Sequence, residues 1–336
     1  MTHTRYAKRN VVEIAKNIAA GILVLACITP FVHIHAQTQT QSQAEEMRRQ
    51  RLQEAIDRRN REISFARLRA ISEQAYRGIP VPREAIKDVD ALYREPTVKE
   101  LEKLLPKAED LANHAIFLRQ GRTGIVRLVA DAGCGDGTMV LAAASPCMEY
   151  PMPGNGSSYS FREANYRLSR LSDLRFVDGN FAVSGVLSHG LLTGIGDISL
   201  DKVQLNTKGI EHLNNFRPAT ELAKAVETGR ELQNAVEKDG YYYAKELKAL
   251  EQMTYVIRSV AYRGNVYRSI GRFVYNELNF DKRMDITVAF RIIRKHEDGS
   301  ITLIWKEIAR KPSPVLKRKK GEPARSDVNK FIANQS

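Results

Sequence analysis

The sequence predicts an α+β protein, in which a helical N-terminal region leads into a largely antiparallel, β-rich domain with an inserted helix. Three observations predict this class. From residue 122 onward, the apolar residues form short runs that often alternate with polar ones, as in strands. Asp-Gly pairs at 178–179 and 298–299 stand between such runs, and Asp-Gly is a strong hairpin signal. Strands also occur in groups, without the strict strand–helix alternation of a parallel sheet.

The first 36 residues predict a secretory signal peptide. Four basic residues and one acidic residue occupy positions 1–17, an uncharged apolar run follows at 18–31, and Ala36 is a small residue suited to the cleavage position. The protein is therefore expected to be exported, either to the periplasm or out of the cell. A membrane-spanning helix needs about 20 apolar residues, and the run at 18–31 is shorter. An uncleaved membrane anchor is therefore the alternative and not the first interpretation.

The three cysteines take their meaning from this expected export. Cys27 ends the stretch LVLAC, which looks like the lipobox of bacterial lipoproteins, so lipidation is one interpretation and an incidental cysteine of the signal peptide is the other. Cys134 and Cys147 remain after cleavage, and an oxidising compartment makes them a candidate disulfide. Two separately buried thiols are the alternative. No CxxC motif or nearby histidine pair is present, so no metal site is predicted.

Two helical segments are expected before the β-rich part. Residues 37–78 form a charged arm, because 44–76 lack glycine and proline and are rich in helix-forming residues; a weak coiled coil is the alternative. Residues 96–121 predict a helix that packs on the domain through a leucine stripe. Pro96 and Thr97 suit its start, and Pro106 is expected to kink it or split it in two.

The β-rich domain is predicted to span residues 122–309. Beside the two Asp-Gly hairpins, strands are expected at 253–262 and 265–275, and a helix at about 218–239 interrupts the strands. Residues 310–336 contain three prolines and a basic cluster, and they predict a disordered basic tail.

The stretch VADAGCGDGT at 129–138 resembles motif I of the S-adenosylmethionine-dependent methyltransferases, in which a strand runs into a D-x-G-x-G loop. That resemblance implies a parallel sheet and a bound S-adenosylmethionine. However, prolines at 146, 151 and 153 would stop the following helix early, strand–helix alternation is missing, and an exported protein would not meet this cofactor. We therefore predict a hairpin turn at Asp136-Gly137, and no cofactor.

Few residues suggest a functional site. His189 stands next to Ser188, and Asp197 follows in the sequence, but adjacency alone does not make a catalytic triad. Tyr241 and Tyr242 belong to a run of three tyrosines that could stack on a ligand, although three consecutive side chains cannot all face one way. These four residues are the weak candidates for catalysis or binding.

The charge of the chain suggests its partners. The net charge is +13, with arginine clusters in 48–77 and a lysine-rich cluster at 317–320 flanking a more balanced middle. A basic balance suggests anionic partners, whether nucleic acid, anionic lipid or acidic polysaccharide, and does not by itself choose among them. An anionic surface of lipid head groups or acidic polysaccharide is the predicted partner, and nucleic acid is not expected. Basic faces that only keep the protein soluble are the alternative. The expected function is an exported, envelope-associated or secreted binding or structural module without catalysis. An extracytoplasmic hydrolase is the alternative, and the methyltransferase is a minor one.

Overall fold

The computed structural model describes residues 83–134, 149–270 and 273–317, all of which belong to the unit that spans residues 71–336. Within these residues the protein is mostly antiparallel β-sheet with a few helices, as expected for the domain. The signal peptide, Cys27, the arm at 37–78 and residues 318–336 lie outside the described residues, so their structure stays a prediction. No helix in the described ranges is long and apolar enough to cross a membrane.

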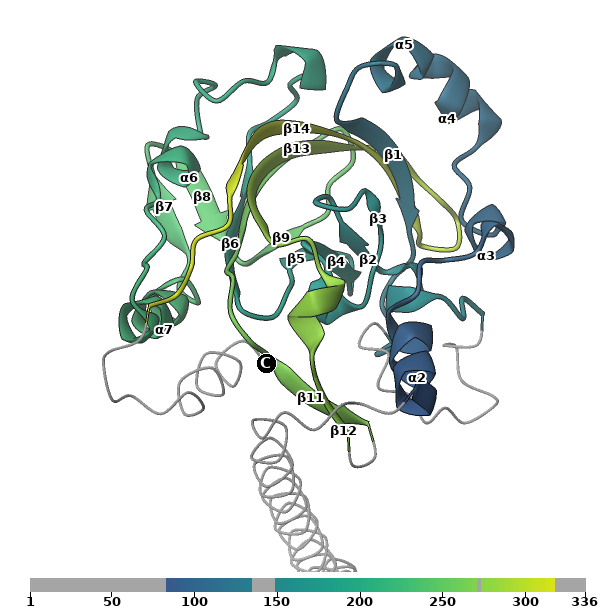
Figure 1. Ribbon diagram of the computed structural model, residues 1–336. Helices are drawn as coiled ribbons and strands as arrows, with labels where there is room; N and C mark the ends of the chain where they lie inside the picture. The colour runs from purple at the N-terminus through teal and green to yellow at the C-terminus, as the bar shows by residue number, and fades with distance from the viewer. Residues whose placement is uncertain (1–82, 135–148, 271–272, 318–336) are drawn as a thin grey trace, which may run out of the picture. The chain divides into compact units, whose positions relative to one another are not determined.

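A seven-stranded antiparallel sheet forms the frame of the domain (Figure 1). Its long strands are curved, and they arch over a second, smaller sheet. The strand order is β1 (Thr123–Leu128), β14 (Ile301–Pro312), β13 (Met284–Lys295), β10 (Thr254–Ala261), β6 (Ser188–Gly194), β8 (Tyr241–Ala244) and β7 (Val236–Lys238).

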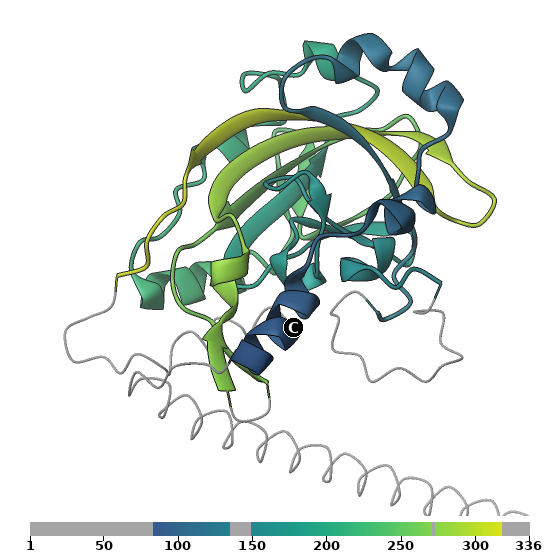
Figure 2. The same cartoon turned by 45° about the vertical axis from the view of Figure 1, so that its right-hand side comes forward.

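The smaller sheet lies inside the curve of the large one, as Figures 1 and 2 both show. Its order is β3 (Asn165–Tyr166), β2 (Ser158–Ser160), β4 (Leu174–Val177), β5 (Asn180–Val183) and β9 (Glu246–Lys248). Aromatic residues fill the space between the sheets, among them Phe161 and Phe181 from the small sheet side and Phe290 and Trp305 from the large sheet. We call this surface of the large sheet its inner face, and the opposite surface its outer face.

Asp-Gly turns build two tight hairpins. Asp178 and Gly179 have φ angles of 49° and 75° between the paired residues Val177 and Asn180. Two consecutive positive φ angles are those of a type I′ turn, so this hairpin is confirmed. Asp239 and Gly240, with φ angles of 53° and 78°, join β7 to β8 in the same way.

The hairpin of β13 and β14 is also confirmed, but its turn is not type I′. Only Gly299 has a positive φ, of 78°. The amide of Gly299 donates to the carbonyl of His296, and the amide of His296 donates to the carbonyl of Ser300. This is a three-residue loop in which a type I turn is followed by a glycine bulge.

Two expected elements, one helix and one strand, differ in extent from the structure. The helix expected at about 218–239 is α7 (Leu222–Glu231), and its last residues instead form β7. The strand expected at 265–275 is a hairpin of β11 (Tyr267–Ile270) and β12 (Phe273–Asn276).

Residues 96–121 are split, as Pro106 suggests, into α3 (Val98–Glu102), α4 (Ala108–Asn113) and α5 (Ala115–Leu118). Thr97 caps α3, because its side chain accepts from the Glu100 amide while the Glu100 carboxylate accepts from the Thr97 amide. Before them, α2 (Arg83–Tyr93) packs through Val89 and Tyr93 onto a second apolar cluster.

The chain beyond residue 309 is ordered for a further eight residues. The strand β14 continues to Pro312, and Val315 and Lys317 form isolated bridges with Arg263 and Glu221. The disorder expected for 310–336 is therefore wrong for 310–317, the described part of that segment.

Candidate functional site

An open cleft lies on the outer face of the large sheet, with a volume of about 300 Å³. This volume is at the lower end of the range for small-molecule sites. Its walls come from α4–α5 on one side and from the segment after β6 on the other. The lining residues are His114, Phe117, Asp197, Ser199, Leu200, Asp201, Arg291, Ile293 and Ile304.

The floor of the cleft is set by strand alternation in β13. Phe290 and Ile292 face the inner core, so Arg291 and Ile293 face outward. The Arg291 guanidinium lies 2.7 Å from a carboxylate oxygen of Asp197, and it donates to the Thr254 hydroxyl at 3.2 Å. Thr254 is the register partner of Arg291 on β10, so the cation is held on two neighbouring strands.

The segment after β6 forms one wall, because the backbone holds it against β10. The amide of Ile195 donates to the Thr254 carbonyl, and the Thr254 amide donates to the Gly196 carbonyl, each at 2.9 Å. Leu200, in the short 3₁₀ helix η4 (Leu200–Lys202), anchors the wall because it is buried in an apolar cluster on the outer face. We call this the outer-face cluster; its buried members are Phe117, Leu191, Ile195, Leu200, Val203, Ile210, Leu213, Tyr243, Val256, Ala289 and Ile304. The Asp197 side chain is nevertheless 73% exposed, so it faces the opening of the cleft.

The helices α4 and α5 form the other wall, on the outer side of β13 and β14 (Figure 1). Phe117 of α5 is buried in the outer-face cluster, and His114 stands at the junction of the two helices. The Gln120 amide lies 3.4 Å from the Asp201 carboxylate and so links the two walls. The cleft therefore combines one cation on its floor with two exposed carboxylates, beside an apolar surface.

Of the residues that the sequence suggested, Asp197 lies in this cleft and His189 does not. His189 is near the start of β6, and Asp197 comes three residues after the strand ends. The strand alone spans about 16 Å from His189 to Gly194. His189 adjoins a separate small cavity, whereas Asp197 lines the cleft. The structure therefore does not bring this histidine and this carboxylate together.

His189 is a buried residue of the sheet. Its Nδ1 lies 3.0 Å from the Tyr262 hydroxyl, and its ring stands edge-on to Phe216 and Tyr262. An apolar cavity of only about 10 Å³, the size of one water molecule, adjoins it. Burial, with a smaller contribution from the charge of Lys245, lowers the pKa of His189 to about 3. The imidazole is consequently neutral at physiological pH.

The tyrosine candidates lie on β8 and face opposite ways. Tyr242 is 52% exposed, whereas Tyr241 packs with the outer-face cluster and Tyr243 is buried within it. Tyr241 also lies against Gly209, where an added Cβ would come within 2.6 Å of its ring. Tyr241 and Tyr242 therefore do not form a single stacking platform.

The described part of the glycine-rich stretch is a turn at the edge of an antiparallel sheet. Strand β1, which leads into it, pairs antiparallel with β14. A carboxylate oxygen of Asp131 accepts the amides of Gly133 and Cys134 at 3.0 and 2.9 Å, so this aspartate shapes the backbone. No parallel sheet occurs among the described strands. The turn expected at Asp136-Gly137 and Cys147 lie outside the described residues, so the pairing of Cys134 with Cys147 stays a prediction.

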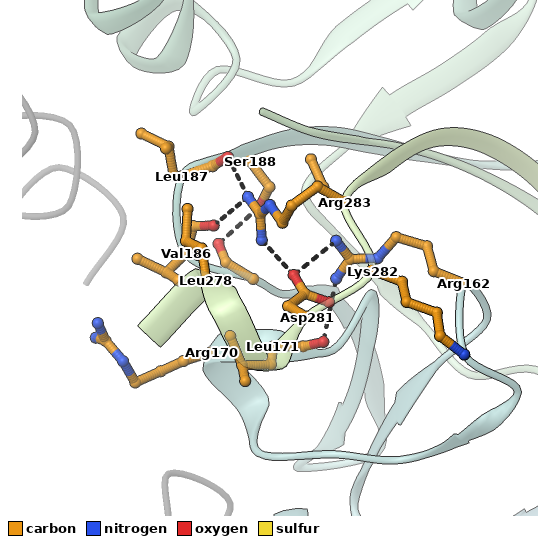
Figure 3. Close-up of polar contacts among 12 residues, drawn as sticks. Arg162, Arg170, Leu171, Val186, Leu187, Ser188, Leu278, Asp281, Lys282 and Arg283 are labelled. Carbon is orange, nitrogen blue, oxygen red and sulfur yellow. Dashed lines mark hydrogen bonds and ion pairs between the residues drawn. The ribbon is translucent and has the colours of Figure 1, made fainter. Parts of the chain in front are cut away.

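A buried charge network was not foreseen from the sequence (Figure 3). Asp281 binds both Arg162 and Arg283, and Arg162 also lies 2.9 Å from Asp173. Arg283 donates in addition to the carbonyls of Val186, Leu187 and Tyr262. Burial alone raises the pKa of Asp281, but the two arginines outweigh it and hold that pKa below its ordinary value.

This network joins distant segments and is closed to solvent. The side chains of Arg162, Asp173 and Asp281 are each at most 1% exposed. The positive charges of Arg162 and Arg283 are balanced by the negative charges of Asp173 and Asp281. The Ser259 hydroxyl also donates a hydrogen bond to the Asp173 carboxylate, at 2.6 Å. With its charges paired and no access for a ligand, the network is a structural feature. Among the described residues, no group of acidic, histidine or cysteine side chains could hold a metal ion.

Comparisons with known proteins found no matching family model, no matching curated protein and no matching solved structure.

Proposed function

We propose that this chain is an exported or envelope-associated binding protein without catalytic activity of its own. In this proposal the outer-face cleft takes a small polar ligand, and the basic ends of the chain attach the protein to an anionic surface. The observation that carries the proposal is the cleft itself, because it is open to solvent, has charges of both signs and rests on a rigid sheet.

The distribution of charge supports the attachment to an anionic surface. Residues 37–82, which remain after the expected cleavage, hold 9 lysines and arginines against 6 acidic residues, and residues 318–336 hold 5 against 2. These ends thus supply six of the ten net positive charges of the expected mature chain. A basic segment gains about 1 kcal/mol per lysine or arginine at an anionic membrane surface.

Vesicle sedimentation tests this attachment. The full chain is mixed with vesicles of neutral lipid, with or without an anionic lipid, at low and high salt. The triple variant R318Q/K319Q/K320Q should bind anionic vesicles about 100-fold more weakly, since three charges are lost. The matched control K248Q/K295Q/K311Q removes three exposed lysines of the β-rich unit and should bind normally. Equal binding to neutral and anionic vesicles would refute the attachment.

Export itself is tested by N-terminal sequencing of the mature protein together with a thiol count under denaturing conditions. A new N-terminus near residue 37 and no free thiol at Cys134 or Cys147 are expected. An intact Met1, or two free thiols in protein from the native host, would contradict this part of the proposal.

A hydrolase is the second candidate, because Ser199, His114 and two aspartates line the same cleft. Against it, no side-chain hydrogen bond joins Ser199, His114 and an aspartate in the described structure, and a triad requires such contacts. Hydrolysis of p-nitrophenyl acetate by the wild type, abolished by both S199A and H114A, would favour the hydrolase.

A titration with S-adenosylmethionine checks the methyltransferase alternative, for which no saturation is expected.

A further inference from the structure

We propose that the outer-face cleft binds a free α-amino acid with an apolar side chain, that is, a ligand with a carboxylate and a protonated amine attached to the same carbon atom. This inference rests on the proposed binding function and names the class of ligand. It follows from three features of the cleft: the donors on its floor, the carboxylates at its mouth, and its apolar surface.

The floor supplies a site for the carboxylate. A guanidinium group has five N–H donors, and Arg291 uses its two Nη atoms for Asp197 and Thr254 in the described contacts. Its side chain is 18% exposed, and Arg291 is one of the residues that line the cleft. Arginine binds carboxylates through short, charge-assisted hydrogen bonds, and these are stronger in a half-buried site than in water.

The mouth supplies a site for the amine. Asp197 and Asp201 both line the cleft and are exposed, whereas Arg291 is the only arginine or lysine among the described lining residues. The aspartates therefore outnumber the cation, and a ligand with only a carboxylate would be repelled by the excess negative charge. A ligand with only an amine would leave the donors of Arg291 unused. A zwitterion satisfies both.

The remaining surface selects an apolar side chain. Phe117, Ile293 and Ile304 line the same cleft, and all three belong to the outer-face cluster or are packed against it. The volume of about 300 Å³ has room for one amino acid. L-Leucine is the probe that we choose, because its isobutyl group matches these side chains.

The test is isothermal titration calorimetry of the full chain with L-leucine and two analogues. The analogue 4-methylpentanoate lacks the amine, and 3-methylbutylamine lacks the carboxylate. L-Leucine should bind at least about tenfold more tightly than either, because each analogue loses a charge-assisted contact. Equal binding of all three, or no saturation by L-leucine up to about 10 mM, would overturn the inference.

Matched variants locate the binding. D201N and R291Q should each weaken L-leucine binding at least about tenfold. K311Q and D178N remove charges of the same signs from exposed positions outside the cleft, and both should bind as the wild type does. D201N changes an exposed side chain, so it keeps the test valid even if R291Q does not fold. Unchanged binding by D201N would overturn the assignment to this cleft.

Vesicle binding is measured on the same samples, so the two proposals can fail separately. Normal binding to anionic vesicles without binding of L-leucine would overturn the ligand class alone. Loss of vesicle binding with retained L-leucine binding would instead refute the surface attachment and support the cleft.

Discussion

Arg258 and Asp285 form a buried, two-pronged ion pair between neighbouring strands, with contacts of 3.0 and 2.8 Å. Both side chains are at most 7% exposed. Arg258 also donates to the carbonyls of Leu213 and Phe216, at the end of α6 (Glu211–Asn215). One arginine therefore joins β10, β13 and the C-terminus of a helix on the outer face of the sheet.

Asp285→Asn should destabilise the protein strongly, because it leaves the buried guanidinium of Arg258 without a counter-charge. We expect the free energy of unfolding to fall by about 3–5 kcal/mol, measured by urea denaturation followed by circular dichroism. Asp178→Asn is the matched control, since Asp178 is exposed and asparagine also suits its positive φ angle. If D285N unfolds at the same urea concentration as the wild type, the ion pair does not contribute as argued.

Acid should weaken the fold partly through His189. Its pKa is about 3 in the folded protein, against an ordinary value of 6.5. Between these two values the unfolded chain binds the proton and the folded protein does not, so stability falls as the pH drops below 6.5. At pH 5 the protonation of His189 in the unfolded chain lowers the free energy of unfolding by about 2 kcal/mol.

His189→Gln removes this titration. The free energy of unfolding of the variant, measured by urea denaturation at several pH values, should therefore depend less steeply on pH between 6.5 and 4 than that of the wild type. Parallel profiles for the two proteins would show that His189 is already protonated in the folded state, contrary to its burial.

Replacing the glycine of either type I′ turn should destabilise the protein. Gly179→Ala or Gly240→Ala places a Cβ on a residue with φ near 75–78°, at a cost of about 1–2 kcal/mol in unfolding free energy. Gly121→Ala is the control, because Gly121 has an ordinary φ and nothing lies within 4 Å of its added Cβ. Thermal unfolding compares the three variants. A loss for G121A as large as that for G179A would contradict the turn assignment.

Local signals in the sequence predicted much of the β-rich fold, because hairpins depend on residues close together in the chain. Asp178-Gly179 shows this directly. Asp239-Gly240 shows the limit of such signals. The same dipeptide also forms a type I′ turn there. The strand before it, β7, is exposed at Val236, Glu237 and Lys238, so no alternation of apolar and polar residues marks it as a strand. Helical composition before it therefore predicted a helix that is too long.

The cleft and the charge network could not be predicted in the same way. His114, Asp197 and Arg291 come from three segments separated by more than 80 residues, and only the pairing of strands brings them to one surface. Likewise, nothing near Arg162 in the sequence indicates its contact with Asp281, 119 residues later. Such contacts are set by topology, which local propensities do not specify.

Gly124 and Trp305 provide a final prediction that depends on this topology. They are register partners on β1 and β14, and a Cβ on Gly124 would lie 2.6 Å from the indole ring. Gly124→Ala should therefore displace the ring or shift β1, and lower the unfolding free energy by about 1–3 kcal/mol. Trp305 is the only tryptophan and is 4% exposed, so its fluorescence should also move to longer wavelength in the folded variant. Gly121→Ala should change neither property, and an unchanged emission spectrum for G124A would mean that the indole does not lie over this glycine.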